Sequence, residues 1–554
     1  MPVLRLLSAF LILLSLSACG GYRNPRQSVL FHVVNTAPFS SLDPAVEQGN
    51  GILILHNVYE TLTVYDDTDG QVKPCLAESW TSNATKTEWT FFLRRDVLFH
   101  DGSLMTAASV KKSIDRVRFL GKGASSIWDC IASIEARDIN IVVFRLNYAA
   151  DLPLIASSSS AAYIISSAAA SRGEAWFNEG HDAGSGPYRI SAASSTSVAL
   201  DAYEGYRGGW LRGKYRRILI AEVPSPERRL GYLQNGKADI VFFPGQETRS
   251  GPAGMTGIGG IPAAGPDTAD GLTGLAGVHR VSRPDDTGST AKDSYKLTLY
   301  KSWQSLVLFF NTEKDPCSSE DFRKALAYAF PYEETVGSIL KGQASRSNGM
   351  VPQGIWGHDP SLPSFRCDLD TAREYLQRSG QQEVTLTLSY QPLSREQTRM
   401  LELYRQNLES LGINLILLES DWETMQMQAQ NPDPDDRQDL LLLRWWPIYA
   451  DPGIIFKTLL VDQGPDKGLN YSYLHAADLS LSLQIASILS LEKRPKAEEI
   501  YRNMQQKVFD RCYLVFLYDT AVSVACRKDI ERVSINPAYA SCISYYNLYN
   551  KENP

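Results

Sequence analysis

The sequence lacks the features that mark a membrane-embedded chain or a nucleic-acid-binding chain. Beyond the N-terminus, none of its 554 residues lies in a run of the roughly 18 apolar residues that a transmembrane helix needs. The formal net charge is −7 and no long basic run occurs, which excludes an electrostatic surface for nucleic acid. The content of 44% apolar and 21% charged residues is ordinary for a globular chain, and the length predicts several domains.

Motifs of catalysis and of metal binding are also missing. The sequence has no GxSxG elbow, no HExxH helix and no SxxK set with its partners. Its 7 histidines show no HxH spacing and its cysteines no CxxC pair. We therefore expect a protein that is not an enzyme, holds no metal and needs no cofactor.

The N-terminus has the layout of an export signal. Arg5 precedes an apolar run over residues 6–16, and Ser17 and Ala18 are small residues at a cleavage position. With Cys19 next, the segment resembles a bacterial lipobox, which implies a signal peptide over residues 1–18 and lipidation of Cys19. Several acyl chains on one residue give stable anchoring to a membrane. The alternative is an ordinary signal peptide followed by a chance cysteine.

Export places the remaining cysteines where disulfides persist. Of the 8 cysteines, Cys19 is assigned to the anchor, so an odd number remains and at least one thiol stays unpaired. Cys512 and Cys526 are symmetric about Asp519 in a segment that reads as a hairpin. That register would place the two thiols opposite each other, near enough to bridge.

The hydrophobic pattern predicts an α/β protein. The clearest unit begins with an alternating strand near residues 384–388 and a capping box at Ser394 and Gln397. A helix follows, stopped by Gly412, and then a strand at 413–418. This βαβ order implies parallel strands joined by a right-handed crossover.

Other segments are predicted less fully. Residues 157–171 fit either a helix or a loose connection, and 245–291 reads as a surface insertion rich in small and polar residues. The other expected elements are a strand at 29–34, a strand pair around 89–99, a helix capped by Thr106, a strand after the 184–190 turn, a helix ending at Pro331, a buried strand at 439–443, a helix at about 495–509, and strands at 512–526 and 540–548.

Short motifs run in order along nearly the whole mature chain. They are LDP at 42–44, NVYETL at 57–62, PCLAESW at 74–80, FFLRRDVLFHDG at 91–102, a helix start at 104–110, SGPY at 185–188, an NT pair at 311–312, a helix at 323–330 and YADP at 449–452. Together they resemble the family 5 extracellular solute-binding proteins, the type that binds oligopeptides, dipeptides and nickel. The FHDG block combined with LAESW is highly specific, although each alone is weak.

The resemblance implies a two-lobed periplasmic-binding-protein type II fold, with an extra small subdomain in the first lobe and a ligand cleft between the lobes. We expect lobe I over 19–60, 185–305 and 512–554, the subdomain over 61–184, the insertion at 245–291, and lobe II over 306–511. Within the motifs, the FHDG segment reads as a turn, so His100 is expected to be structural. Glu78 and Trp80 are expected to anchor the subdomain by hydrogen bonding and packing.

The implied function is that of the substrate-binding component of an ABC importer, attached to the cell envelope on its periplasmic or extracellular side. The expected partners are a small solute or a peptide, the ABC permease with its ATPase, and the membrane through the lipid anchor. We expect a monomer and no nucleic acid. Two alternatives stay open: a ligand that is not a peptide or has a blocked amine, such as a metal chelate, opine, sugar or cell-wall peptide, and a sensor that does not transport.

Family contacts come from both lobes, and two regions match them here. The first follows the strand at 29–34, where an extended ligand backbone would pair with the chain, and the second follows the strand at 439–443, where aromatic side chains would form pocket walls. The candidate residues are Val34, Asn35, Thr36, Arg444, Trp445, Trp446, Tyr449, Asp451 and Asn470. Alternatively, Trp446 and Tyr449 pack within lobe II, and Asn470 is a turn residue.

One departure from the family pattern bears on the ligand. Several peptide-binding members carry an aspartate three positions before the Asp of the DP pair, where it holds the free amine of the peptide. This chain has Ile448 there. An apolar side chain cannot compensate the desolvation of an ammonium group, so Asp451 or another acid substitutes, or the ligand has no free amine.

Overall fold

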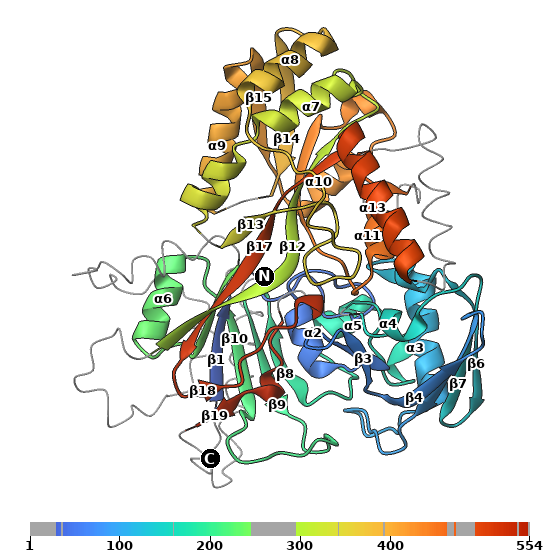
Figure 1. Cartoon of the computed structure of the whole chain (residues 1–554). Coiled ribbons are helices and arrows are strands. Elements are labelled where there is room, and N and C mark those ends of the chain that lie inside the picture. Colours follow the sequence, from blue (N-terminus) through green and yellow to red (C-terminus); the bar gives the residue numbers. More distant parts are fainter. Residues whose placement is uncertain are drawn as a thin grey trace, which may run out of the picture.

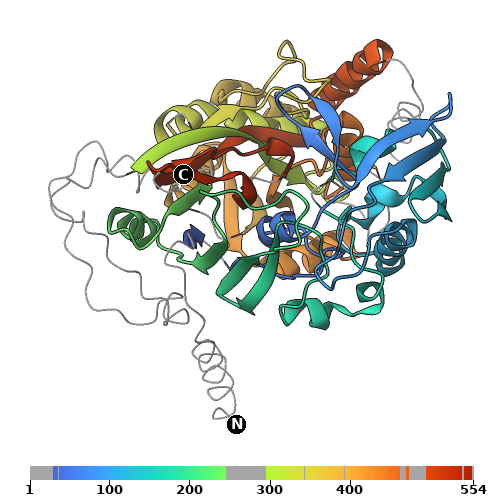
Figure 2. The same cartoon turned by 90° about the horizontal axis from the view of Figure 1, so that it is seen from below.

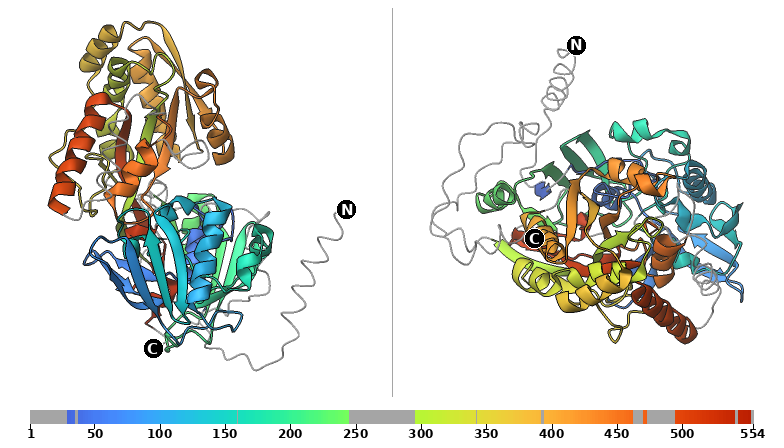
Figure 3. Two further views of the ribbon diagram at one scale, coloured as in Figure 1. Left: turned by 90° about the vertical axis from the view of Figure 1, so that its right-hand side faces the viewer. Right: turned by 90° about the horizontal axis from the view of Figure 1, so that it is seen from above.

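The computed structural model describes residues 29–34, 37–158, 160–244, 295–341, 343–391, 394–461, 470–472, 494–539 and 542–551. These residues form two lobes, one above the other in Figure 1 and in the left view of Figure 3. A subdomain lies beside the sheet of the lower lobe, as Figure 2 shows from below. The expected insertion at 245–291 and the expected lipidation site, Cys19, lie outside the described residues.

Two long antiparallel strands run through both lobes and join them (Figure 1). They are β12 (Tyr295–Phe310) and β17 (Leu514–Arg527), at the centre of one continuous sheet with the order β15-β14-β16-β12-β17-β11-β1-β10-β9-β8. Their register shifts between Lys301 and Ser305, and again between Leu306 and Val307. Such bulges bend a strand and increase its twist, so the sheet changes direction where one lobe meets the other.

The first lobe is built on parallel strands in the middle of its half of the sheet. β1 (Val29–Val34) has the predicted bounds and pairs in parallel with β10 (Arg217–Glu222) and β11 (Ile240–Pro244). Leu30 of β1 packs into a first-lobe cluster with Ile218 and Ile220 of β10, whereas Val33 packs into a smaller cluster. The other elements of this lobe are α2 (Ile52–Val58), β8 (Tyr188–Ser194), β9 (Ser197–Ala202), α6 (Pro226–Gln234), β18 (Ile530–Glu531) and β19 (Tyr549–Asn550).

The subdomain consists of a four-stranded antiparallel sheet packed against one helix. The helix, α3 (Ala107–Leu120), begins with the predicted Thr106 cap, whose hydroxyl accepts a hydrogen bond from the Ser109 N–H, and ends at Gly121 with φ 61°. The sheet order is β4-β5-β7-β6. The bounds are β4 (Ala77–Ser82), β5 (Glu88–Leu93), β6 (Ile131–Asp138) and β7 (Ile141–Leu146), with a hairpin of β2 (Thr63–Asp66) and β3 (Gln71–Pro74) and the short helices α4 (Leu152–Ile155) and α5 (Glu174–Asn178).

The second lobe contains the predicted βαβ unit. β14 (Val384–Tyr390), α9 (Arg395–Glu409) and β15 (Ile413–Glu419) follow one another, and the strands pair in parallel. β16 (Leu440–Trp445) continues the parallel order beside β14 and meets β12 antiparallel. The remaining elements are α7 (Glu320–Ala329), a π-helical turn (Glu334–Ile339), β13 (Ala344–Arg346), α8 (Leu369–Ser379), α10 (Trp422–Ala429), α11 (Pro452–Leu460) and α13 (Arg494–Arg511).

The C-terminal expectations need correction. Residues 512–526 form no hairpin, because β17 is one continuous strand that passes from the second lobe into the first. Cys512 packs in the core of the second lobe and Cys526 in the core of the first, and both are free thiols, as are the other described cysteines. Between 542 and 548 the described chain forms a 3-10 turn (Tyr545–Asn547) in place of the expected strand.

The structure also bears on the expected lobe boundaries at 305/306 and 512, on the strand pair around 89–99 and on the segment 157–171, for which two interpretations were open. The division at 305 and 306 falls inside β12, beside its register shifts, and Leu514 and Val515 of β17 pack with second-lobe side chains. The strand pair expected around 89–99 is made instead by β4 and β5. Within 157–171, the described residues form a loose connection with one short 3-10 turn (Ala169–Ser171).

Candidate functional site

The parallel strands of the first lobe end toward the second lobe. β11 runs antiparallel to β17, with Ile240 opposite Cys526 and Pro244 opposite Val522. Since β17 descends from the second lobe, the Val522 end lies nearer to that lobe. β1 and β10 are parallel to β11, so Val34 and Glu222, which are in register, also lie at the ends that face the second lobe.

The strands of the second lobe end in the opposite direction. β16 runs antiparallel to β12, with Leu440 opposite Phe310 and Trp445 opposite Ser305, the residue that follows the first register shift. Its carboxyl end, and those of its parallel neighbours β14 and β15, therefore face the first lobe. In open α/β sheets, ligands bind outside the carboxyl ends of the strands, and here two such sets of ends face each other.

The predicted residues around Trp445 differ in burial and in direction. Trp445 is only 6% exposed and packs in a second-lobe cluster that includes Trp303 and Leu441, with its ring edge-on to Phe516 at 6.3 Å between centroids. Strand alternation places Arg444 on the other face, with Leu440 and Leu442. Trp446 and Arg444 are half-buried.

The segment after β16 lies where the second lobe meets the subdomain. Ile448 and Tyr449 pack both against the second-lobe cluster and against a subdomain cluster that includes Trp89, Phe91 and Trp128. The Ser158 hydroxyl donates a hydrogen bond of 3.0 Å to the Ile448 carbonyl. Burial raises the pKa of Tyr449 well above its ordinary value, and the neighbouring Asp451 raises it further. The segment that the sequence predicted to face the cleft therefore lies between the second lobe and the subdomain.

A second polar contact joins the same two parts of the molecule. The Lys457 ammonium in α11 lies 3.0 Å from the Asp129 carboxylate in the subdomain and 3.4 Å from the Ser126 carbonyl. Together with Ser158, these contacts hold the lobes against each other in the described structure. Sequence reasoning missed Ser158, Asp129 and Lys457, because partners 290 and 328 residues apart leave no local pattern.

The other predicted site residues have varied positions. The Asp451 carboxylate accepts a hydrogen bond of 2.7 Å from the Gly453 N–H and so caps α11. The Val34 carbonyl accepts a hydrogen bond of 2.8 Å from the Val223 N–H. Asn470 is half-buried, whereas Asn35 and Thr36 lie outside the described residues. The ligand-binding roles of all these residues remain predictions.

Two polar side chains of the sequence motifs, His100 and Glu60, are bound to neighbouring groups of the fold. Both ring nitrogens of His100 are bonded, one to the Asp182 carboxylate and one to the Gly186 carbonyl at 2.9 Å, in keeping with a structural role. Glu60 binds the Arg207 guanidinium at 2.5 Å and the Ser185 hydroxyl at 2.9 Å.

The expected anchoring role of Glu78 is not found, because its side chain is exposed and makes no hydrogen bond within the described structure. Trp80, by contrast, is half-buried and packs beside Phe91 at 6.1 Å between ring centroids.

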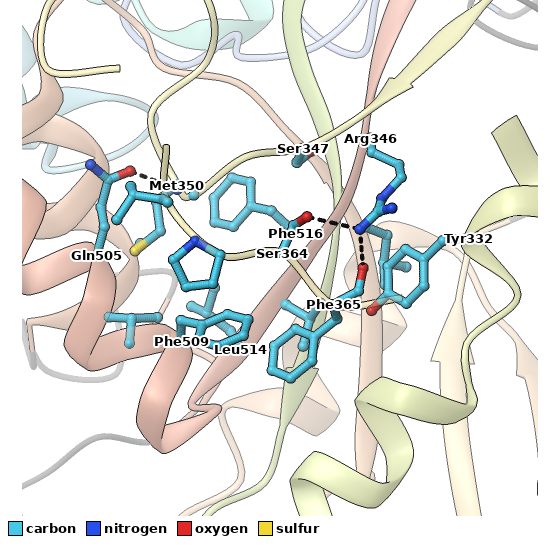
Figure 4. A pocket seen from close by; sticks show the side chains of 16 residues that line it. Tyr332, Arg346, Ser347, Met350, Ser364, Phe365, Gln505, Phe509, Leu514 and Phe516 are labelled. Carbon is cyan, nitrogen blue, oxygen red and sulfur yellow. Dashed lines mark hydrogen bonds between the residues drawn. The ribbon is translucent and has the colours of Figure 1, made fainter. Parts of the chain in front are cut away.

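A separate small cavity lies in the second lobe (Figure 4). Its volume is about 40 Å³, room for a few water molecules and too small for a dipeptide. Arg346 is fixed at its wall by hydrogen bonds to the Ser364 hydroxyl at 2.8 Å and the Phe365 carbonyl at 2.6 Å, as Figure 4 shows. The lining residues include Tyr332, Met350, Gln505, Phe509 and Phe516. We assign this cavity no part in solute capture.

No helix among the described residues is both long and apolar enough to cross a membrane. The same residues contain no group of three or more metal-ligating side chains that could hold a metal ion.

The model of the bacterial extracellular solute-binding proteins, family 5, matches residues 71–257 and 270–466. The chain belongs to this family. Its members are extracytoplasmic solute receptors of ABC importers, not enzymes. The chain is 24% identical over 512 residues to the probable D,D-dipeptide-binding periplasmic protein DdpA of Escherichia coli K12, covering 90% of each chain.

Solved structures share the fold of this family 5 protein. A dipeptide-binding protein of Pseudoalteromonas sp. SM9913 in complex with Met-Leu matches with a TM-score of 0.77 and 19% identity, over 95% of this chain and 100% of that one. The binding protein MoaA of A. tumefaciens R10 in complex with mannopinic acid gives a TM-score of 0.76 and 19% identity, over the same shares. The type II periplasmic-binding fold predicted from the sequence is thereby confirmed.

Proposed function

We propose that this chain is a lipid-anchored receptor that captures a small peptide by closure of its lobes and delivers it to an ABC permease. The observation that carries the proposal is the arrangement of strand ends: β1 and β10 end toward the second lobe, and β16 ends toward the first. An extended solute between these ends would contact both lobes at once. Contacts made only in the closed form bias such a hinge toward closure.

The closing contacts support the same reading. Ile448 and Tyr449 bury apolar surface against the subdomain, and the Ser158 and Lys457 contacts are polar ties across the same seam. A solute held between the facing strand ends would be enclosed by the first lobe, the second lobe and the subdomain. Lobes joined by two strands, β12 and β17, can separate without unfolding.

Peptides are the favoured ligand class. Relatives named for dipeptides and structures of related proteins with bound peptides support this choice. The second candidate is a ligand without a free amine, such as an opine, and Ile448 is the observation that favours it. Its side chain is packed between two apolar clusters and offers no charge to an ammonium group. The complex with mannopinic acid supports this candidate by likeness of fold alone.

Calorimetric titration of the purified mature chain tests the proposal. We expect a panel of di- to tetrapeptides to contain a binder of micromolar or tighter affinity, with 1:1 stoichiometry and an unchanged ligand recovered afterwards. An opine that binds while every peptide fails would favour the second candidate. Recovery of a cleaved peptide would contradict both.

A further inference from the structure

A ligand with a free ammonium group needs a carboxylate at the site that is not already bound to other groups. Two acids near the lobe seam are engaged. Asp129 pairs with Lys457 at 3.0 Å, and Asp451 caps α11 through the Gly453 N–H at 2.7 Å. A third, Glu47, is buried and accepts hydrogen bonds from the backbone N–H groups of Ser41 and Gly49.

Glu222 differs from these acids. It is the last residue of β10, in register with Val34 at the carboxyl end of β1. Its side chain is half-buried, and within the described structure its carboxylate makes no hydrogen bond and no ion pair. A carboxylate that loses part of its water without gaining a partner carries a desolvation cost, which a cationic ligand group would offset.

Strand alternation gives the direction of this side chain. Glu222 is on the same face of β10 as Ile218 and Ile220, which belong to the first-lobe cluster. The register carries this face through Ile240 of β11 and along β17 from Cys526 to Tyr518, which pairs with Leu306. Leu306 in turn pairs with Arg444, so Glu222 shares its face of the continuous sheet with Arg444, whereas Trp445 is on the other face.

We propose that Glu222 is a ligand-binding residue that holds the cationic group of the solute, the free ammonium of a small peptide whose backbone lies along the end of β1. The inference rests on the proposed function, and it assigns to the end of β10 the charge that Ile448 lacks. Glu222 would bind the ammonium by a charge-assisted hydrogen bond, and it would discriminate against acylated amines. It would therefore determine specificity rather than the closure of the lobes.

The test compares the mature chain with its E222Q variant. Glu78→Gln is the matched control, because Glu78 is also without a described partner but lies exposed on β4 of the subdomain. A dipeptide mixture is screened by thermal shift. The best binder and its N-acetyl derivative are then titrated against all three proteins, with circular dichroism melts to confirm folding.

We expect the wild type and E78Q to bind the free dipeptide at least about tenfold more tightly than the acetylated form, the effect of one partly buried charge pair. E222Q should lose about tenfold for the free form and little for the acetylated one. Equal affinity of E222Q and wild type for the free dipeptide overturns the assignment, as does equal loss for both forms or a wild-type preference for the acetylated peptide. If the wild type binds no peptide of either form, peptide capture itself fails.

Discussion

The Ser158 hydroxyl of the subdomain donates a hydrogen bond of 3.0 Å to the Ile448 carbonyl of the second lobe. This bond joins two segments that would separate if the lobes opened. Ser158→Ala should therefore weaken solute binding about two- to tenfold, the range of one net hydrogen bond. The melting temperature should also fall, because the same hydroxyl accepts a hydrogen bond from the Ser160 N–H within the subdomain. Ser157→Ala is the control, since the Ser157 hydroxyl bonds to the Leu154 carbonyl within the subdomain. Titration of both variants checks this, and an equal loss in the two would show that the bond has no part in closure.

The Lys457–Asp129 ion pair spans the same seam, with side chains 18% and 45% exposed. Because the pair is partly solvated, its coupling energy should stay below about 1 kcal/mol and should fall as salt is added. A double-mutant cycle with Lys457→Met and Asp129→Asn, read from solute affinity at low and high salt, measures it. A coupling that salt leaves unchanged would contradict an exposed closing contact.

Trp445 combines a core position with a place at the end of β16. Because the side chain is 6% exposed, Trp445→Ala should lower the free energy of unfolding by about 3–5 kcal/mol. Trp445→Phe should keep the fold and, if the ring also faces the solute, should abolish part of the fluorescence change on binding. Denaturant melts and fluorescence titrations separate the two effects. An unaltered fluorescence change and affinity in Trp445→Phe would remove this residue from the site.

The buried His32 and the half-buried His56 determine how the stability of the fold is expected to respond to acid. Burial lowers the pKa of His32 from 6.5 to about 3 and that of His56 to about 4. Below pH 6.5 the unfolded chain binds protons that the folded chain does not, so stability is fully present above pH 6.5 and is lost as pH falls toward 4. The loss at pH 5 should be about 2 kcal/mol for each histidine.

Denaturant melts between pH 7.5 and 4.5 measure this slope. His32→Gln should reduce it, whereas His181→Gln should not, because the His181 side chain is 54% exposed. A slope that His32→Gln leaves unchanged would contradict the neutral, buried state of His32.

The lipid anchor is tested at Cys19. We expect Cys19→Ala to abolish metabolic labelling with a fatty acid and to shift the protein from the membrane fraction to the soluble fraction or to an unprocessed form. Cys75→Ala, a thiol within the folded chain, serves as the control. Labelling that persists without Cys19 would refute the lipobox.

The sequence predicted the local elements well where periodicity and caps agreed. The strand at 29–34, the Thr106 helix start and the unit from 384 to 419 all appear as expected, because short-range patterning and burial point to the same structure there. The segment Arg444–Pro452 was predicted to face the cleft because it follows a continuous apolar strand. Two of its residues, Ile448 and Tyr449, do lie between the second lobe and the subdomain.

The errors arose where distant partners decide the structure. Asp519 reads as a turn residue between two strands. In the fold it is a half-buried acid within β17 whose carboxylate accepts hydrogen bonds from the Ser305 and Ser347 hydroxyls at 2.7 and 2.6 Å. Burial raises its pKa, and two residues far away in sequence make its position tolerable. Likewise, no local pattern could bring Ser158 to Ile448.

Native mass spectrometry of the freshly purified mature chain tests solute capture most directly. We predict a population carrying one non-covalent adduct of small-solute mass, which is released intact on unfolding and is restored when the stripped chain is incubated with extract of the producing cells. A chain that stays bare after that incubation, or one that returns a chemically altered solute, would contradict capture between two closing lobes.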